Sequence, residues 1–418
     1  MSGRPKIERP RGTHDVVPAE MPAWQRVTRE IEGLCQLYGY RRIVTPVFED
    51  TALFARTSGA GSDVVQKEMY TFSDRSDRSL TLRPEGTAPI CRAYVEHGMH
   101  RDPQPVKLYT IASMYRYGAP GRGRYREHWQ ASVEALGSDD PAIDAELIQL
   151  YDTLLVRLGV TRYHLELNSI GCRDCRPAYL ETLRAWLAEH GDRLDQDTRD
   201  KAEVSPLRVF DNYLAKPPTV RDALDEAPKI GESLCAACVD HFAAVRAGLD
   251  ATGVRYTLVP TLVRGLDYYS RTTFEFIGPT ENQNSTITGG GRYDYLVEEI
   301  GGPPTPGIGF GAGIERLLIA MAEEGVEVPE GPGTDVFLAL DEGAPRDSVA
   351  RWLAELRRAG IAAETDYAGR SLKGQLTHAR RLGAAHIVVV GSDTASLRQP
   401  GREDEPIEHA EIVSRLSA

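Results

Sequence analysis

The order of apolar and polar residues predicts a chain that mixes helices with sheet. From Met21, apolar residues recur at helical spacing as far as Tyr38, where the next residue is a glycine that can cap the helix. Between residues 80 and 133 strand-like pieces are separated by turns rather than regular helices, which is typical of an antiparallel sheet. A helix is predicted over residues 141–158 and a strand over 163–169.

The stretch from Gly171 to Gly253 is charge-rich and mostly helical in pattern, so we interpret it as an insertion. After it, LVRGLDYYSRTTFEF at 262–276 predicts a strand preceded by a short turn. GIGFGAGIERLL, at 307–318, predicts a strand that continues as a helix.

Residues 326–333, VEVPEGPG, are the best candidate for a linker because proline and glycine disfavour both helix and strand. Beyond them, the strand-like pieces DVFLALD, IAAETD and AHIVVVG alternate with helical patterns at 345–359 and 371–382. This alternation predicts a small α/β domain.

Composition narrows the function classes. The chain has 418 residues and a formal net charge of -12, which argues against non-specific binding of nucleic acid over its whole surface, so any RNA must meet local basic patches. We expect no DNA partner. We also expect no segment that spans a membrane, because no run of about 18 apolar residues is present. The N-terminus shows no signal peptide, which predicts a cytoplasmic protein whose six cysteines are thiols or metal ligands.

Three short motifs carry polar chemistry, and each has a plain structural alternative. The alternate glycines of GIGFGAGIER leave one face of a strand bare, either for a flat ring such as a nucleobase or for close packing. YRYGAPGRGRYREHWQ places four arginines on two strands and their loop, either as phosphate contacts or as a solvated face. In LRPEGTAP, Glu85 and Thr87 can hold an ammonium group or form an ordinary turn.

Taken in order, these motifs resemble the histidyl-tRNA synthetases, which are class II aminoacyl-tRNA synthetases, over essentially the whole chain. RGTHDVVPAE is similar to the N-terminal signature of the family, and RRIVTPVFEDTALF resembles class II motif 1, with Pro46 at the dimer-forming position. The arginine-rich motif resembles motif 2 and GIGFGAGIERLL motif 3. LVRGLDYYSRTTFEF and GGGRYD resemble the histidine signatures, and DYAGRSLKGQLTHARRLGA the anticodon-binding domain.

The resemblance implies an α+β fold: an antiparallel class II sheet flanked by helices, a mostly helical insertion, and a small C-terminal α/β anticodon-binding domain. The resemblance implies a catalytic domain in two parts, at 1–170 and 255–325, which are separated by an insertion at 171–254. A linker at 326–333 then leads to an anticodon-binding domain at 334–418. A homodimer is implied by motif 1.

The implied function is histidine–tRNA ligation: L-histidine and ATP give histidyl-adenylate and pyrophosphate, and the histidyl group then passes to the 3' end of tRNA(His). Fixed cations must offset the repulsion between a carboxylate and an α-phosphate. Arg264 is implied as the catalytic arginine on the α-phosphate and the histidine carboxylate, Arg116 would hold the α-phosphate, and Arg316 the γ-phosphate. Mg²⁺ would bridge the outer phosphates, and Gly309 and Gly311 would lie against ATP.

Further roles follow from the same resemblance. Glu134 and Tyr269 would contact the imidazole nitrogens, which discriminates strongly because the wrong amino acid leaves polar groups unpaired. The remaining implied histidine-binding residues are Glu85, Gly86, Thr87, Gln130, Tyr268 and Tyr293. The implied contacts to the tRNA acceptor end are Arg122, Arg124 and Arg126.

The motif 2 loop departs from the family pattern, since Gly118, Ala119 and Gly121 replace the usual glutamate, arginine and glutamine. These positions belong to the loop associated with the acceptor end, so we hypothesise an altered acceptor-end identity. Asp267 receives no role from the sequence beyond orienting a neighbour.

Two C-x-x-C pairs, Cys172 with Cys175 and Cys235 with Cys238, match a structural tetrahedral zinc site, although reduced free thiols are the alternative. Two other functions compete with ligation. One is the non-catalytic, histidine-binding regulatory subunit of ATP phosphoribosyltransferase, which typically lacks the anticodon-binding domain. The other is a generic RNA-binding module, which would not need the glycine strand and paired arginines.

Overall fold

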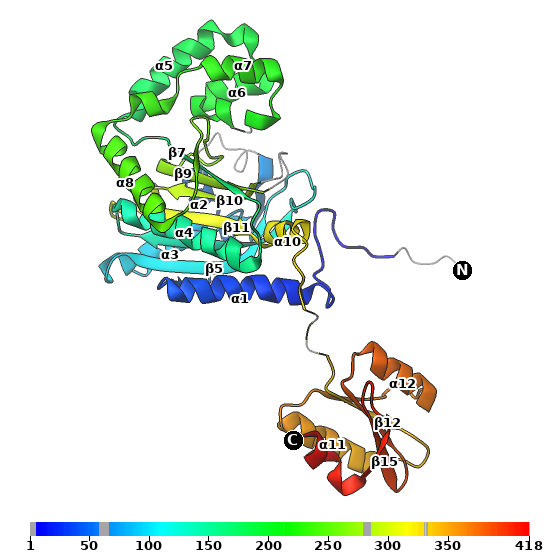
Figure 1. Ribbon diagram of the computed structural model, residues 1–418. Coiled ribbons are helices and arrows are strands. Elements are labelled where there is room, and N and C mark those ends of the chain that lie inside the picture. Colours follow the sequence, from blue (N-terminus) through cyan, green and yellow to red (C-terminus); the bar gives the residue numbers. More distant parts are fainter. Residues whose placement is uncertain are drawn as a thin grey trace. The chain divides into compact units, whose positions relative to one another are not determined.

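The computed structural model describes residues 6–57, 67–211, 213–278, 286–329, 331 and 333–417. The chain forms two compact units, Met1–Val328 and Pro329–Ala418 (Figure 1). The larger unit is built on an antiparallel-rich sheet with helices, as the α+β prediction requires. No helix among the described residues is long and apolar enough to cross a bilayer.

An eight-stranded sheet forms the centre of the larger unit. Its strands in spatial order are β1 (Arg41–Arg42), β5 (Val106–Tyr115), β6 (Glu127–Leu136), β11 (Gly307–Gly313), β10 (Thr286–Arg292), β9 (Ser270–Ile277), β7 (His164–Ser169) and β8 (Thr257–Leu258). The six central strands are antiparallel to one another, and the edge strands β1 and β8 pair in parallel with β5 and β7. The predicted strand at 163–169 and the two strands flanking the arginine-rich loop are confirmed.

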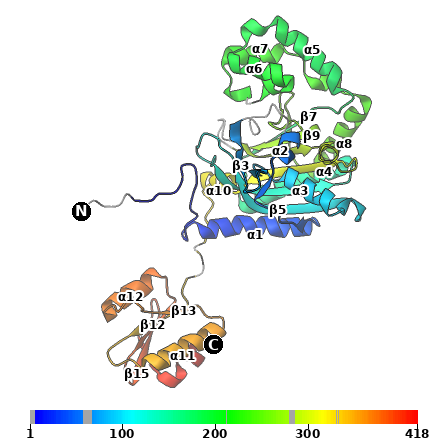
Figure 2. The ribbon, with the colours of Figure 1, turned by 180° about the vertical axis from the view of Figure 1, so that it is seen from behind.

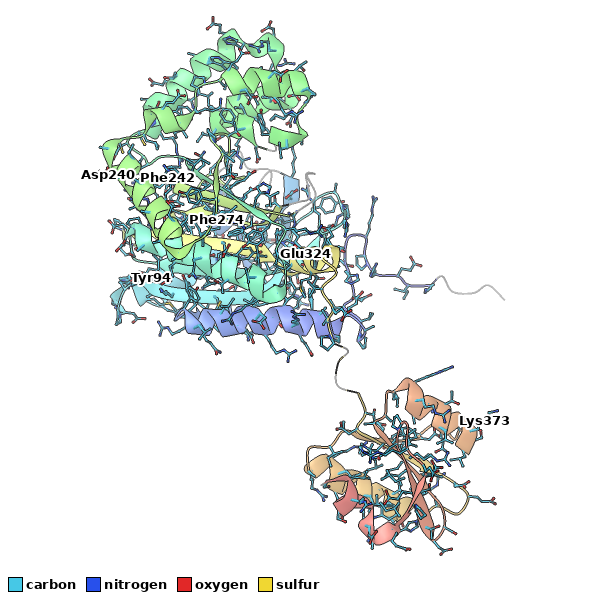
Figure 3. The ribbon with its side chains drawn as sticks, in the orientation of Figure 1. Tyr94, Asp240, Phe242, Phe274, Glu324 and Lys373 are labelled. Atoms are coloured by element: carbon cyan, nitrogen blue, oxygen red, sulfur yellow. The ribbon has the colours of Figure 1, made fainter. Side chains whose placement is uncertain are left out.

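Four helices form a layer on one face of this sheet (Figure 2). They are α1 (Met21–Leu37), α4 (Pro141–Leu158), α8 (Ala236–Thr252) and α10 (Ile314–Glu323). Alternate strand residues such as Tyr109 point into this layer and are buried, because successive side chains of a strand face opposite sides. Phe274 of β9 is another (Figure 3). The predicted helices at 21–38 and 141–158 are confirmed.

A smaller sheet of β2 (Phe48–Asp50), β4 (Ser79–Leu82) and β3 (Tyr70–Ser73) lies beside the short helices α2 (Thr51–Thr57), α3 (Thr87–Glu96) and α9 (Leu296–Glu299). The prediction of strand-like pieces without helices is wrong at α3. The cause is Glu85, whose carboxylate accepts hydrogen bonds from the backbone N–H groups of Thr87 and Ala88 and so begins a helix where the sequence suggests a turn.

The insertion leaves the sheet after β7 and consists of α5 (Arg176–Glu189), α6 (Gln196–Val204), α7 (Pro218–Glu226) and the short 3-10 helices η3 (Gly191–Arg193), η4 (Pro206–Phe210), η5 (Tyr213–Ala215) and η6 (Ile230–Ser233). Its apolar residues belong to the same buried cluster as residues of α3 and of the histidine signatures. The chain then returns through α8, which packs along α4. The insertion is therefore continuous with the core of the larger unit.

The structure of residues 262–276 shows that the sequence prediction is partly wrong. The strand β9 begins only at Ser270, and residues 259–269 form a loop rather than a short turn. Side chains from elsewhere hold this loop: Asn168 donates to the carbonyl of Leu262 at 2.9 Å, for example. The local sequence pattern cannot predict a hydrogen bond from a residue so distant in the sequence.

The smaller unit has a five-stranded sheet of β13 (Ala363–Thr365), β12 (Val336–Leu340), β14 (His386–Val390), β15 (Thr394–Arg398) and β16 (Glu405–Glu408). The first three strands are parallel, with α11 (Arg346–Arg358) and α12 (Leu372–Arg381) between them, which confirms the predicted α/β domain. The antiparallel strands β15 and β16 and the helix α13 (Ile412–Leu416) were not predicted. Lys373 projects from α12 into solvent (Figure 3).

Candidate active site

A polar cavity of about 650 Å³ lies in the larger unit. The residues that line it include these predicted site residues: Glu85, Thr87, Arg116, Arg124, Gln130, Arg264, Tyr268, Tyr269, Gly311 and Arg316. The insertion contributes Asp195, Asp197, Lys201 and Lys216. Six other residues predicted to bind histidine, ATP or tRNA do not line the cavity: Gly86, Arg122, Arg126, Glu134, Tyr293 and Gly309.

Three arginines from separate elements meet in the cavity. Arg116, just after β5, donates to the carbonyl of Pro84 at 2.7 Å, and Arg264 forms an ion pair with Glu275 of β9. Arg316, in the first turn of α10, donates to the carbonyls of Gly123 and Thr286. Arg116 and Arg316 bond to carbonyl oxygens, which leave their positive charges in place, so these two guanidinium groups suit an anionic ligand.

The pKa shifts of the cavity residues are consistent with a site that binds an anion. Burial, followed by the charges of Arg116, Arg124 and Arg264, lowers the pKa of Arg316. Burial, followed by Arg116 and Arg316, lowers the pKa of His128 to about 3, so this imidazole is neutral at physiological pH. A bound anion would relieve the repulsion among these arginines.

The glycines of β10 and β11 serve two purposes. A Cβ on Gly289 would lie 2.4 Å from the guanidinium of Arg264, and one on Gly311 would lie 2.6 Å from the amide nitrogen of Gln130. At Gly307 and Gly309 the space is filled by the ring of Tyr293 and the carboxylate of Glu134. Close packing thus explains Gly307 and Gly309 of β11, whereas Gly311 borders the cavity.

The predicted histidine-binding residues form one buried cluster. The rings of Tyr268 and Tyr269 lie 4.7 Å apart, and burial raises the pKa of both phenols, which are therefore neutral. Gln130 donates to the hydroxyl of Ser132 at 2.9 Å, and a Cβ on Gly86 would collide with the same hydroxyl. Tyr268, Tyr269 and Gln130 of this cluster line the cavity.

Glu134 lies beneath this cluster. It is fully buried, and its two carboxylate oxygens accept from the hydroxyls of Thr87 at 2.7 Å and Tyr293 at 2.5 Å. Burial raises the pKa of Glu134 well above its ordinary value. In this arrangement Glu134 orients Thr87, which lines the cavity.

The arginine-rich loop is held by ion pairs. Arg122 pairs with Glu323 at 2.8 Å and Arg124 with Glu68 at 2.7 Å, and Arg126 stacks on the ring of Tyr117. A Cβ on Gly118 would lie 3.1 Å from both Arg124 and Glu68. The glycine therefore leaves room for this ion pair.

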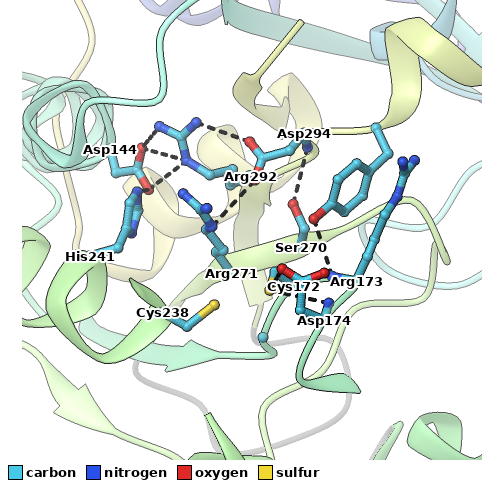
Figure 4. A network of polar contacts seen from close by, with 12 residues as sticks. Asp144, Cys172, Arg173, Asp174, Cys238, His241, Ser270, Arg271, Arg292 and Asp294 are labelled. Atoms are coloured by element: carbon cyan, nitrogen blue, oxygen red, sulfur yellow. Dashed lines mark hydrogen bonds and ion pairs between the residues drawn. The ribbon is translucent and has the colours of Figure 1, made fainter. Parts of the chain in front are cut away.

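Arg292 of GGGRYD has a structural role (Figure 4). It is fully buried between Asp144 and Asp294, and it also donates to the carbonyl of Ser138 at 2.9 Å. Burial alone would lower its pKa, but the two carboxylates outweigh burial and raise it. Arg292 therefore joins α4 to the end of β10.

The four cysteines predicted to bind zinc come together, with all four Sγ atoms within 4.8 Å of one another. The Sγ of Cys172 lies 3.8 Å from those of Cys175 and Cys235, and Cys175 lies 3.9 Å from Cys238. A tetrahedron with Zn–S bonds of about 2.3 Å has edges of about 3.8 Å, whereas a disulfide bond measures about 2.05 Å. The four thiols fit a zinc ion and form no disulfide.

The sequence did not reveal several cavity residues. Glu275 was detectable in principle as the one charged residue of the strand segment TTFEFI. His128, Lys201 and Lys216 gave no signal, because their place depends on how the motif 2 strand and the insertion fold.

A family model described as Histidyl-tRNA synthetase matches residues 12–317, more than half of the chain. The chain belongs to the histidyl-tRNA synthetase family. A second model, described as Anticodon binding domain, matches residues 337–404. The larger unit therefore carries the synthetase region and the smaller unit an anticodon-binding domain.

Curated relatives extend over nearly the whole chain. A protein of Moorella thermoacetica named histidine–tRNA ligase is 48% identical over 386 residues, which cover 92% of this chain and 90% of that protein. One of Caldanaerobacter subterraneus with the same name is 45% identical over 384 residues, covering 92% and 91%.

Solved structures agree with this family. The apo S. aureus histidyl-tRNA synthetase has a TM-score of 0.82 and 35% identity and covers 99% of this chain and 100% of that chain. A Bacillus halodurans structure titled as an ATP phosphoribosyltransferase regulatory subunit/histidyl-tRNA synthetase has a TM-score of 0.65 at 21% identity, covers 93% and 99%, and shows the shared fold alone. The regulatory-subunit alternative is thus less supported than ligation.

Proposed function

We propose that this chain is a histidine–tRNA ligase that activates L-histidine with ATP and transfers the histidyl group to the 3' end of tRNA(His). The observation that carries the proposal is the meeting of Arg116, Arg264 and Arg316 with the buried tyrosines in one cavity. Family membership supplies the reaction class. We infer that the protein acts in the cytoplasm.

In the activation step the arginines hold the reacting groups. Arg264 would contact both the α-phosphate and the histidine carboxylate, which brings two anions together and stabilises the charge that develops between them. Arg116 would also hold the α-phosphate, and Arg316 the γ-phosphate. Gly311 lines the cavity, and its missing side chain makes room for the amide of Gln130. No side chain is required as a general acid or base.

Histidine selection falls to the tyrosine cluster. Tyr269 would bond an imidazole nitrogen, while Glu134, which does not line the cavity, would act indirectly by orienting Thr87. Glu85, Thr87 and Gln130 would hold the ammonium group. An amino acid without two ring nitrogens would leave these buried polar groups unpaired, which costs affinity.

Two metals complete the proposal. Mg²⁺ would be held mainly by the ATP phosphates, and carboxylates that line the cavity, such as Glu275, would complete its shell. Cys172, Cys175, Cys235 and Cys238 would hold a structural Zn²⁺ with no open position. Metal analysis should find one zinc per chain, and a Cys238→Ser variant should lose it and unfold more easily; a zinc-free protein indifferent to chelator would reject the site.

For tRNA, we propose that Arg122, Arg124 and Arg126 approach the acceptor end, and that Arg122 and Arg124 exchange their carboxylate partners for phosphates. The catalytic domain would comprise 1–170 and 255–325, interrupted by the insertion at 171–254, with a linker at 326–333. The domain at 334–418 would bind the anticodon.

The test of this function is aminoacylation. Purified protein should attach histidine, and no other amino acid, to a tRNA(His) transcript in the presence of ATP and Mg²⁺. Charging of a different tRNA, or acceptance of a different amino acid, would contradict the assignment.

A further inference from the structure

The loop of residues 259–269 carries three proposed active-site side chains, Arg264, Tyr268 and Tyr269, yet it contains no helix or strand, and all of its residues are described. Its backbone carbonyls are held by side chains from other elements. At its beginning, Asn168 of β7 donates to the carbonyl of Leu262 at 2.9 Å. The later carbonyls are held by two arginines of the insertion.

The first of these, Arg208 of η4, is only 4% exposed. Its Nε donates to Asp267 Oδ1 at 3.0 Å, and its Nη2 donates to the carbonyl of Gly265, the residue that follows Arg264. A buried guanidinium is stable only with such partners, because removing one leaves an uncompensated charge. The contact between insertion and loop is therefore specific, and it explains Asp267.

The second, Arg176, is the first residue of α5 and follows Cys175. Its Nη2 donates to the carbonyl of Tyr269 at 2.7 Å. Arg176 and Arg208 thus hold the two ends of the short segment Gly265–Tyr269.

The position of Arg264 depends closely on this segment. Its guanidinium lies against the bare backbone of Gly289, where even a Cβ would be 2.4 Å away, and it pairs with Glu275. A shift of Gly265 would move the guanidinium relative to both partners. Displacements of about 1 Å can cost on the order of 100-fold in rate.

We propose that Arg208, through Asp267 and the carbonyl of Gly265, is a positioning residue for Arg264, so that the insertion is part of the histidine-activating site. This inference rests on the proposed ligase function. Arg208 is not among the residues that line the cavity. Its contribution is made through the loop.

The test uses Asp267→Asn, which removes the ion pair with almost no change of volume, together with Arg208→Gln and Arg208→Lys. Histidine-dependent exchange between ATP and pyrophosphate is measured in the full-length protein, well below the lowest unfolding temperature. We expect kcat to fall about 10- to 100-fold in Asp267→Asn and Arg208→Gln, with much smaller changes in KM for histidine and ATP. Arg208→Lys should recover part of the loss.

A double variant, Arg208→Gln with Asp267→Asn, should be scarcely slower than Arg208→Gln alone, because the pair acts as a unit. The matched control is Arg193→Gln, which breaks an exposed pair with Glu226 in the same insertion and should leave kcat unchanged. Wild-type kcat in folded Asp267→Asn would overturn the inference. Exchange absent from the wild type would instead overturn the ligase function itself.

Discussion

Arg264 is the side chain on which the proposed chemistry depends most. Its planar fork can bind a phosphate and a carboxylate together, and Arg264→Ala should lower kcat for pyrophosphate exchange about 100- to 1000-fold. Arg264→Lys should restore only part of this, because an ammonium group keeps the charge but loses the fork. Arg29→Ala, an exposed substitution on α1, is the control. A nearly active Arg264→Ala would remove the arginine from the mechanism.

Glu315 gives a second prediction for a single residue. Burial raises its pKa to about 7 from an ordinary value of 4.5, although the backbone N–H of Trp129 partly offsets this by donating to its carboxylate at 2.9 Å. A raised pKa in the folded state contributes stability that is present below pH 4.5 and lost as the pH rises through 7. The loss amounts to about 3 kcal/mol at most.

Glu315→Gln removes this titration while keeping an oxygen for Trp129. Relative to the wild type, the variant should therefore gain stability between pH 5 and pH 8, which thermal unfolding at the two pH values measures. Parallel changes in the two proteins would show that Glu315 titrates normally.

At the scale of elements, the sequence predicted those parts whose patterns are local. The helices α1 and α4 bury one face each and show it in their spacing, and the strand β11 and helix α10 follow from the glycine run and the apolar residues after it. The helix α3 and the loop at 259–269 escaped prediction, because a carboxylate cap and donors distant in sequence determine them.

The same distinction applies to the candidate site. Its arginines and tyrosines were named from motifs, but the burial of Glu134 beneath Thr87, the filling of Gly309 and the link between Arg208 and Asp267 depend on packing between distant segments. Only a three-dimensional arrangement brings these groups together.

The motif 2 loop gives a prediction for an element. Because Gly118 lies against the pair of Arg124 with Glu68, no side chain at this position is available to read a base. Charging of tRNA(His) variants at the discriminator base and at the extra 5' nucleotide should therefore differ by much less than it does for a relative with the usual glutamate and arginine. An ordinary bacterial preference would contradict this.

At the scale of the whole molecule, the motif 1 segment exposes apolar side chains. Val44 is 78% exposed and Phe48 51%, while buried Arg83 holds the backbone between them through the carbonyl of Thr45 at 2.9 Å. Such a rigid apolar surface is typical of an interface between subunits, and we propose a homodimer.

Sedimentation measurements test the dimer. The wild type should sediment as a dimer and Val44→Glu as a monomer, because a charge placed in an apolar interface is costly to bury. Val204→Glu, at an exposed valine of the insertion, should remain dimeric. A monomeric wild type would refute the assignment.

The central claim is that the cavity activates histidine, and its most direct test is exchange of labelled pyrophosphate into ATP by the purified, folded wild-type protein. Exchange should depend on histidine, stay at background with each other amino acid, and need no tRNA. Histidine binding without any exchange would contradict the claim and favour a regulatory, non-catalytic protein.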